Sequence, residues 1–202
     1  MPDLQPSDEE LARRFLAGNL HAFESLVQRY SKPLYNFALN FLGDPDEADE
    51  AAQLVFVQVY QSLPRAHLDS PLKPWIYQIA RNKCIDLWRA RAPLSLSGRE
   101  GHSNDDDFDP PAFDVADPSP ALDELAEHSD LQRILREAIH ALPPNYRMAV
   151  TLRYVNDLSF GEIAAVMKVP ENTAKTYFQR AKKLLRQKLG EDFRRSAGVK
   201  NG

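Results

Sequence analysis

The stretch SFGEIAAVMKVPENTAKTYFQRAKKLLRQKL, residues 159–189, contains two amphipathic segments separated by a short break. Ser159 followed by Glu162 has the pattern of a capping box, which predicts the start of a short helix. A Val-Pro pair ends that helix, and a longer helix is expected to begin near Glu171. A short helix, a break of about three or four residues and a longer helix match the spacing of a helix-turn-helix motif.

The longer of these two segments has two chemically different faces. One face is apolar at helical spacing, and we expect it to form the core with Ala174, Phe178, Ala181, Leu185 and Leu189. The opposite face carries amides, hydroxyl groups and cations, which bind base edges at the start of such a helix and phosphates further along. The predicted duplex-contacting residues are Asn172, Thr173, Lys175, Thr176, Gln179, Arg180, Lys183 and Arg186. The alternative for the cations alone is an ordinary solvated basic face.

The charges of the 202-residue chain are unevenly distributed, although the net charge is only −4. Residues 100–130 contain eleven Asp or Glu and no Lys or Arg, whereas residues 168–200 contain ten Lys or Arg and three acidic residues. An acidic middle and a basic end indicate a nucleic-acid partner, or a protein that mimics nucleic acid.

The composition argues against several other classes of protein. Cys84 is the only cysteine, so no internal disulfide can form, which suits a reducing cytoplasm. No Cys/His cluster has the spacing of metal ligands, and we expect neither a metal nor a cofactor. No apolar run is long enough to span a bilayer, so membrane insertion is not expected. The histidines are scattered and no catalytic pair is evident, which argues against an enzyme.

The pattern predicts an all-α protein of two small helical domains joined by a flexible acidic linker. The first domain spans residues 1–92, the linker 93–120 and the second domain 121–190, with a tail over 191–202. The linker is rich in Asp, Pro, Ser and Gly without an apolar period. In the first domain, Ser7 and Asp44 are predicted helix N-caps. Pro33 is expected to kink or split its helix.

Two segments of the first domain show a second face beside the core face. On the segment 44–63, Leu54 and Val57 lie among amides, which favours a partner-binding patch, a helix buried on both sides being the alternative. A strand is also conceivable for LVFVQVY, because its valines alternate. A loop from Pro64 to Pro74 is expected to precede a helix from Trp75 to about Ala90. The second face of that helix comprises Trp75, Gln78, Asn82, Ile85 and Arg89, flanked by Arg81 and Trp88. Aromatic rings, amides and Arg suit single-stranded nucleic acid, and the loop could form a pocket for an extruded base.

The chain resembles the extracytoplasmic-function (ECF, group 4) sigma factors of bacterial RNA polymerase in three stretches: EADEAAQLVFVQVYQSL (47–63), PWIYQIARNKCIDLWRAR (74–91) and ALPPNYRMAVTLRYVNDLSFGEIAAVMKVPENTAKTYFQRAKKLLRQKL (141–189). The resemblance covers both domains in the order of the family. It implies that the first domain is σ2 and the second is σ4, and that the chain directs the polymerase to promoters of a stress or environmental-response regulon.

The resemblance also implies roles for particular residues. In the family, the helix equivalent to 44–63 docks on the β′ clamp helices, which would involve Asp49, Gln53, Leu54 and Val57. The σ2 loop and the helix that follows it bind the non-template strand of the minus-ten element, here with Arg65, Lys73, Trp75, Gln78, Arg81, Asn82 and Arg89. The σ4 helix-turn-helix reads the minus-thirty-five element as duplex and σ4 also binds the β flap, while the linker runs toward the RNA exit channel. Family members are often held inactive by an anti-sigma factor packed between σ2 and σ4.

The sequence departs from the family pattern at two places. Ala52 and Leu54 stand where a more polar pattern is common, and Asn172 and Tyr177 stand where Gly and Arg are frequent. The promoter sequence is therefore not predicted. Two alternatives stay open: a helix-turn-helix regulator without initiation activity, and a sigma mimic that sequesters an anti-sigma factor.

Overall fold

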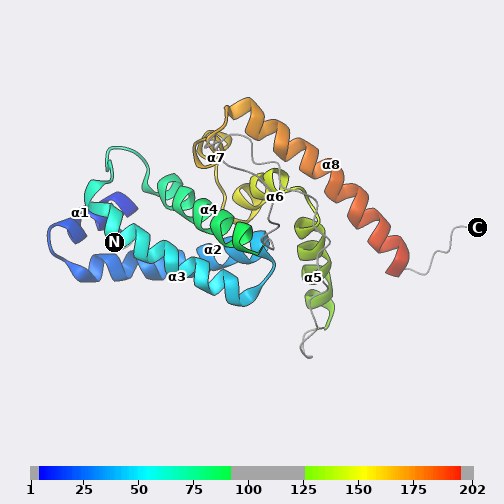
Figure 1. Cartoon of the computed structure of the whole chain (residues 1–202), viewed down its shortest axis with the longest axis horizontal. Coiled ribbons are helices and arrows are strands. Elements are labelled where there is room, and N and C mark those ends of the chain that lie inside the picture. Colours follow the sequence, from blue (N-terminus) through cyan, green and yellow to red (C-terminus); the bar gives the residue numbers. More distant parts are fainter. Residues whose placement is uncertain (1–4, 92–125, 197–202) are drawn as a thin grey trace, which may run out of the picture.

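The computed structural model describes residues 5–91 and 126–196, with side chains described for 5–91 and 133–190. The N-terminal block (residues 5–91) contains α1 (Asp8–Leu16), α2 (Leu20–Leu42), α3 (Pro45–Ser62), the 3-10 turn η1 (Leu63–Arg65) and α4 (Leu72–Ala90). The C-terminal block (residues 126–196) contains α5 (Ala126–His140), α6 (Pro144–Val150), the π turn η2 (Thr151–Val155), α7 (Phe160–Met167) and α8 (Glu171–Ser196). The described residues contain no strand, so the all-α prediction is confirmed (Figure 1). The predicted acidic linker, 93–120, lies outside them.

Side-chain caps begin the helices where the sequence predicts them. The Asp44 carboxylate accepts from the backbone N–H groups of Asp46 and Glu47 at 2.9 and 3.0 Å, which starts α3. Ser159 and Glu162 form a complete capping box at the start of α7. Ser7 caps α1 by accepting from the Glu10 N–H at 3.2 Å. These caps satisfy amide groups that a helix end otherwise leaves without a partner.

Three expectations about helix limits are corrected by the structure. Pro33 does not split its helix, because α2 runs unbroken from Leu20 to Leu42 and buries Leu34, Phe37, Ala38 and Phe41 beyond the proline. That burial outweighs the roughly 3 kcal/mol that an internal proline costs. Helix α4 begins at Leu72 rather than Trp75, because the Glu9 carboxylate accepts from the Leu72 N–H at 2.8 Å. Helix α8 continues past Leu189 to Ser196.

The two blocks share one continuous apolar core. Helix α4 packs against α3 on one side and against α7 on another, and α2 contacts α5, α6 and η2 of the C-terminal block (Figure 1). The segment LVFVQVY is helical in α3, so the strand alternative is wrong. Among the described residues, no helix is long and apolar enough to cross a membrane.

Candidate nucleic-acid interface

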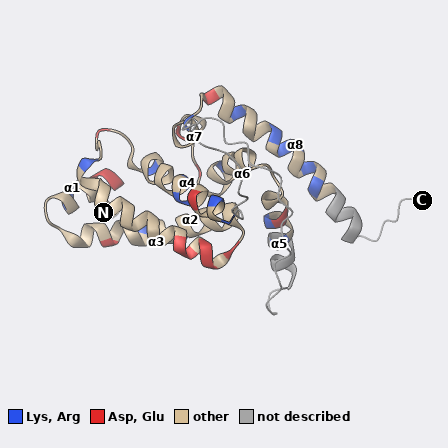
Figure 2. Cartoon of the chain, viewed as in Figure 1, with Lys and Arg blue, Asp and Glu red and all other residues tan. Residues whose placement is uncertain are grey.

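Helix α8 presents the predicted polar face to solvent. The core side of α8 is as expected: Ala174, Phe178, Ala181 and Leu185 are at most 8% exposed. The predicted duplex-contacting residues are exposed except Thr173, which is half-buried: Asn172, Lys175, Thr176, Gln179, Arg180, Lys183 and Arg186. Figure 2 shows Lys and Arg recurring along this helix. The face therefore offers donors and cations to a ligand outside the protein.

Local contacts orient part of this face. The Thr176 hydroxyl donates to the Asn172 carbonyl at 2.8 Å, and the Lys175 ammonium pairs with Glu171 at 2.6 Å. Arg180 donates to the Tyr146 hydroxyl at 3.4 Å, and this hydrogen bond raises the pKa of Arg180 above its ordinary value. Because the Lys175–Glu171 pair is solvent-exposed, it is weak and can be exchanged for a phosphate contact.

The break between α7 and α8 fixes the direction in which α8 leaves α7. Lys168, the C-cap of α7, has a left-handed backbone with φ 55° and ψ 44°. Its N–H donates to the carbonyl of Ala165, and the next N–H donates to that of Ala164. These bonds close the end of α7 as a Schellman-like cap, so the chain turns directly into α8.

The predicted single-strand face of α4 is only partly exposed. Asn82 and Arg89 are exposed, as is Arg65 in η1, while Lys73, Trp75 and Gln78 are half-buried. Arg81 is 8% exposed and Ile85 7%, although both were expected on the outward face or its flank. The reason is tertiary: both residues line a small cleft with Pro144, Asn145 and Met148 of the C-terminal block.

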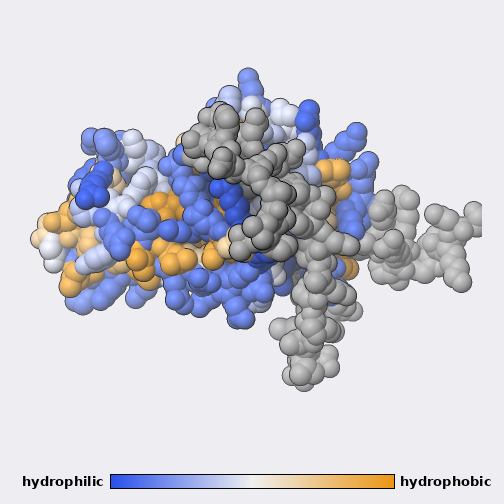
Figure 3. Space-filling view, viewed as in Figure 1, coloured by the Kyte–Doolittle hydropathy of each residue, from blue (hydrophilic) through white to orange (hydrophobic). Residues whose placement is uncertain are grey.

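The second face of α3 is exposed, as predicted. Val57 is 54% exposed and Leu54 37%, while Gln53 donates to Asp49 at 2.7 Å on the same surface. Sequence reasoning missed the extension of this apolar surface to Tyr60, which is 49% exposed and packs against the rings of Phe15 and Phe23. Helical spacing could have identified Tyr60, because it follows Val57 by three residues and therefore lies beside it on the helix surface. Figure 3 shows apolar surface on the left of the view, over the N-terminal block.

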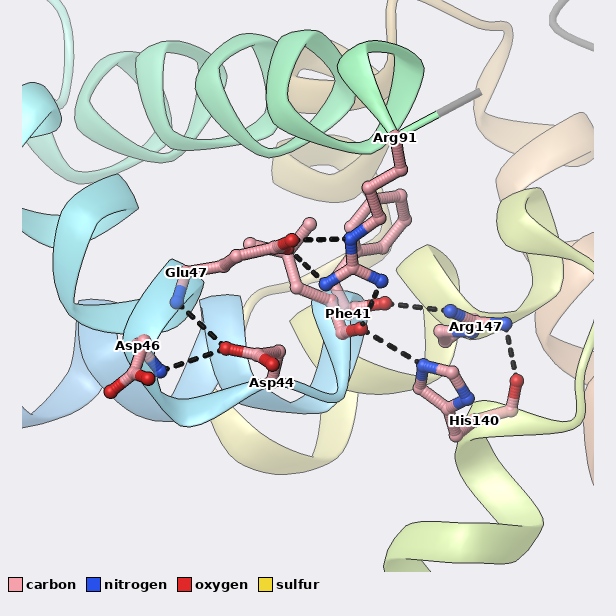
Figure 4. A network of polar contacts seen from close by, with 8 residues as sticks. Phe41, Asp44, Asp46, Glu47, Arg91, His140 and Arg147 are labelled. Atoms are coloured by element: carbon pink, nitrogen blue, oxygen red, sulfur yellow. Dashed lines mark hydrogen bonds and ion pairs between the residues drawn. The ribbon is translucent and has the colours of Figure 1, made fainter. Parts of the chain in front are cut away.

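A polar network at the C-terminal end of α2 was also missed. His140 Nε2 donates to the Leu42 carbonyl at 3.1 Å, and Arg147 donates to the Phe41 carbonyl at 2.6 Å (Figure 4). Arg91 donates to the same Leu42 carbonyl at 3.0 Å and pairs with Glu47. No sequence pattern points to the contacts of His140 and Arg147, because their partners are backbone carbonyls 98 and 106 residues away.

The surroundings of His140 and Arg147 determine the protonation states of these two side chains. Burial lowers the pKa of His140, and the charges of Arg147 and Arg91 lower it further. The imidazole is therefore neutral at pH 7. Burial also lowers the pKa of Arg147 to about 10, which leaves the guanidinium charged. Its charge faces the carbonyl end of α2, where the helix dipole favours a cation.

Two family models match the chain in the order of its blocks. Sigma-70 region 2 matches residues 26–93, and Sigma-70, region 4 matches residues 132–185. The ECF RNA polymerase sigma-E factor of Escherichia coli (strain K12) is 30% identical over 198 residues, covering 95% of this chain and 98% of that protein. The ECF RNA polymerase sigma factor SigW of Bacillus subtilis (strain 168) is 28% identical over 177 residues, covering 85% and 91%.

Two solved structures share the fold. The structure of CnrH in complex with the cytosolic domain of CnrY matches with a TM-score of 0.69 at 24% identity, over 93% of this chain and 99% of that one. The sigma factor RpoE in complex with the anti-sigma factor NepR from Bartonella quintana matches with a TM-score of 0.63 at 21% identity, over 83% and 96%.

The chain is thus a protein of the Sigma-70 class, with region 2 in its N-terminal block and region 4 in its C-terminal block. Within that class it belongs to the ECF RNA polymerase sigma factors, which are transcription initiation factors that direct the polymerase to promoters.

Proposed function

We propose that this sigma factor divides promoter recognition between its two blocks. The C-terminal block reads the minus-thirty-five element as duplex with α8 in the major groove. The observation that carries this proposal is the exposed polar face of α8, with amides at its start and cations further along. In a helix-turn-helix the first residues of the recognition helix reach base edges, so Asn172, Lys175 and Thr176 act in readout. Lys183 and Arg186 contact phosphates.

The N-terminal block holds the non-template strand of the minus-ten element once the duplex opens. Arg65, Asn82 and Arg89 are exposed for phosphates and bases, and Trp75 supplies an aromatic face at the start of α4. The segment between η1 and α4 takes the extruded base. Lys73, Gln78 and Arg81 complete this surface, although the C-terminal block engages part of it in the structure.

Docking on the polymerase uses the second face of α3. Leu54 and Val57 provide an apolar centre, and Asp49 and Gln53 provide polar contacts beside it. Exposed apolar side chains of this kind mark a protein interface. The docked elements are the β′ clamp helices, while the C-terminal block binds the β flap.

The chain acts in the cytoplasm with the polymerase and is controlled by an anti-sigma factor. The presence of such a partner in the RpoE complex with NepR supports this part of the proposal. The regulon is of the stress or environmental-response type. The acidic residues 93–120 follow the RNA exit channel, and exchange of Asp105, Asp106, Asp107 and Asp109 for Asn should alter promoter escape. Unchanged escape would contradict that role.

Mapping of transcript 5′ ends tests the proposal. The protein is mixed with bacterial core polymerase and genomic DNA of its host, with a second sigma factor as the control for active core. We expect starts that share two spaced upstream motifs. Exchange of Asn172 for Ala should weaken selection at the upstream motif, and exchange of Asn82 for Ala should weaken use of the downstream one. The absence of starts beside an active control would refute the proposal and favour a helix-turn-helix regulator without initiation activity or a sequestering mimic.

A further inference from the structure

The segment between η1 and α4, residues 66–71, is called the pocket loop, since the proposed function assigns the extruded base to it. Most of its side chains are exposed to solvent: His67, Asp69, Ser70 and Pro71. A loop with this exposure has little burial to hold it in one shape. The contacts that fix its shape therefore have to come from a neighbouring element, and helix α1 lies beside η1 and α4 (Figure 1).

Helix α4, which follows the pocket loop, has no side-chain cap of its own. Its N-cap residue is Pro71, whose side chain has no hydrogen-bonding atom. Glu9 of α1 supplies the missing acceptor, because its carboxylate accepts from the Leu72 N–H at 2.8 Å. A negative charge is also favoured at this end of a helix by the helix dipole. The same bond lowers the pKa of Glu9, so the carboxylate is charged at pH 7.

A second contact from α1 reaches the middle of the pocket loop. The Arg13 guanidinium donates to the Leu68 carbonyl at 3.3 Å. Glu9 and Arg13 are four residues apart in α1, so both side chains lie on the same face of that helix. A donor and an acceptor from a single helix face therefore hold the loop at the Leu68 carbonyl and at the Leu72 N–H, respectively.

Helix α1 is itself firmly attached to the rest of the N-terminal block. Asp8 pairs with Arg29 of α2 and accepts from the Tyr30 hydroxyl. Burial raises the pKa of Tyr30, so this hydroxyl keeps its proton. Leu11 and Ala12 are buried in the apolar core. Because α1 is fixed on α2, it can act as a rigid support for the pocket loop.

No role in promoter recognition follows for α1 from the family models. Sigma-70 region 2 matches from residue 26 onward, so α1 (Asp8–Leu16) lies ahead of the matched residues. None of the predicted site residues lies on α1 either. The contacts of Glu9 and Arg13 with the pocket loop are what connects this helix to the proposed single-strand site.

We propose that Glu9 and Arg13 are positioning residues for the extruded base: they hold the pocket loop in the shape that accepts the base, without touching DNA themselves. This inference rests on the proposed function for the assignment of the base to the loop. A loop that is already ordered loses less conformational freedom when it binds, and this difference appears as affinity. Removal of either contact should therefore weaken binding of the base and leave the phosphate contacts of the strand intact.

Binding of the downstream strand to the chain assembled with core polymerase tests the proposal. One probe is a fluorescent single-stranded oligonucleotide with the downstream motif of the mapped starts. The other probes carry an abasic site at each position of that motif in turn. An abasic strand keeps its phosphates and lacks one base, so it separates binding of that base from binding of the backbone.

Glu9→Met and Arg13→Met each remove one contact and keep an unbranched side chain that suits a helix. Each should lower the affinity for the intact strand about fivefold, as expected for one hydrogen bond. On the strand that lacks the extruded base, the affinity of these variants should equal that of the unaltered chain. Glu9→Gln keeps an oxygen that accepts from the Leu72 N–H, so it should retain most of the affinity.

The matched control is Glu10→Met, at the position next to Glu9 in α1. The Glu10 carboxylate pairs with Arg14 at 2.8 Å within the same helix instead of bonding to the pocket loop. This control should keep the affinity of the unaltered chain for every strand. Binding of a duplex with the upstream motif should be unchanged in all the variants, since α8 lies in the other block.

The results separate a positioning role from a general structural one. A deficit of both Met variants that disappears on one abasic strand supports positioning, whereas equal affinity of these variants and the unaltered chain for the intact strand overturns it. A deficit that persists on every abasic strand also overturns it, because it indicates a general loss of structure in the N-terminal block. So does a loss in Glu9→Gln as large as that in Glu9→Met. Failure of the proposed function would instead appear in the unaltered chain, as an absence of mapped starts.

Discussion

Exchange of both Lys183 and Arg186 for Gln should weaken duplex binding and reduce its dependence on salt. Both side chains are exposed on the outer face of α8, opposite the buried Ala181 and Leu185. A cation that contacts a phosphate releases a condensed counterion, and each contact contributes about 0.9 to the slope of log affinity against log salt concentration. Two lost contacts should reduce the slope by about 1.8 and, at about 0.1 M salt, the affinity by about 60-fold.

Fluorescence anisotropy of a labelled promoter duplex at several salt concentrations measures both quantities. The matched control is Lys188→Gln, because Lys188 is also exposed but lies about 140° around the helix from Lys183. The control should keep the slope of the unaltered chain, and all variants should keep its unfolding temperature. An unchanged slope in the double variant, or an equal loss in the control, would refute the placement of α8 in the groove.

Three further predictions concern other parts of the chain. Val57→Asp should abolish binding to core polymerase in a pull-down at unchanged unfolding temperature, because Val57 is 54% exposed; Leu184→Asp, at a position 37% exposed on α8, should retain binding. Asp44→Ala removes the cap of two α3 amides and should lower the free energy of unfolding in urea by about 1 kcal/mol, and a loss below experimental error would argue against the cap. The pKa of His140 is lowered in the folded chain by burial and by two neighbouring arginines. The contribution of His140 to stability is therefore fully present above the ordinary pKa near 6.5 and weakens as the pH falls below it, so the unfolding temperature should fall more steeply below that pH in the unaltered chain than in His140→Gln, and equal pH profiles would contradict this.

The local signals in the sequence were reliable where one residue type determines the geometry. Asp44 and Ser159 start helices as predicted, since a carboxylate or hydroxyl satisfies the first amides of a helix irrespective of the rest of the fold. The core face of α8 was also predicted, because a helical apolar period identifies the side that must be buried. Pro33 does not split α2, since the cost of an internal proline is local and the burial that offsets it is tertiary.

The two candidate DNA surfaces differ in how well the sequence predicted their exposure to solvent. The outer face of α8 is exposed as predicted, because it needs only a helix with one buried side. The outward face of α4 was predicted from the same reasoning, yet Arg81 and Ile85 are buried. A helix can be covered on a second side by a distant segment, and periodicity within the helix contains no information about that segment.

The sequence alone determined the helices, their caps, the buried face of α8 and the family to which the chain is similar. These depend on local spacing and on side-chain chemistry that a short segment carries by itself. Only the tertiary structure decided that Asn156 reaches Tyr77 and that Arg147 reaches the end of α2, positions 79 and 106 residues apart in the chain. The physical reason is that these contacts join amides and cations to a hydroxyl and to backbone carbonyls. Every residue except proline has the same backbone groups, so only the packing of the two blocks determines which of them meet.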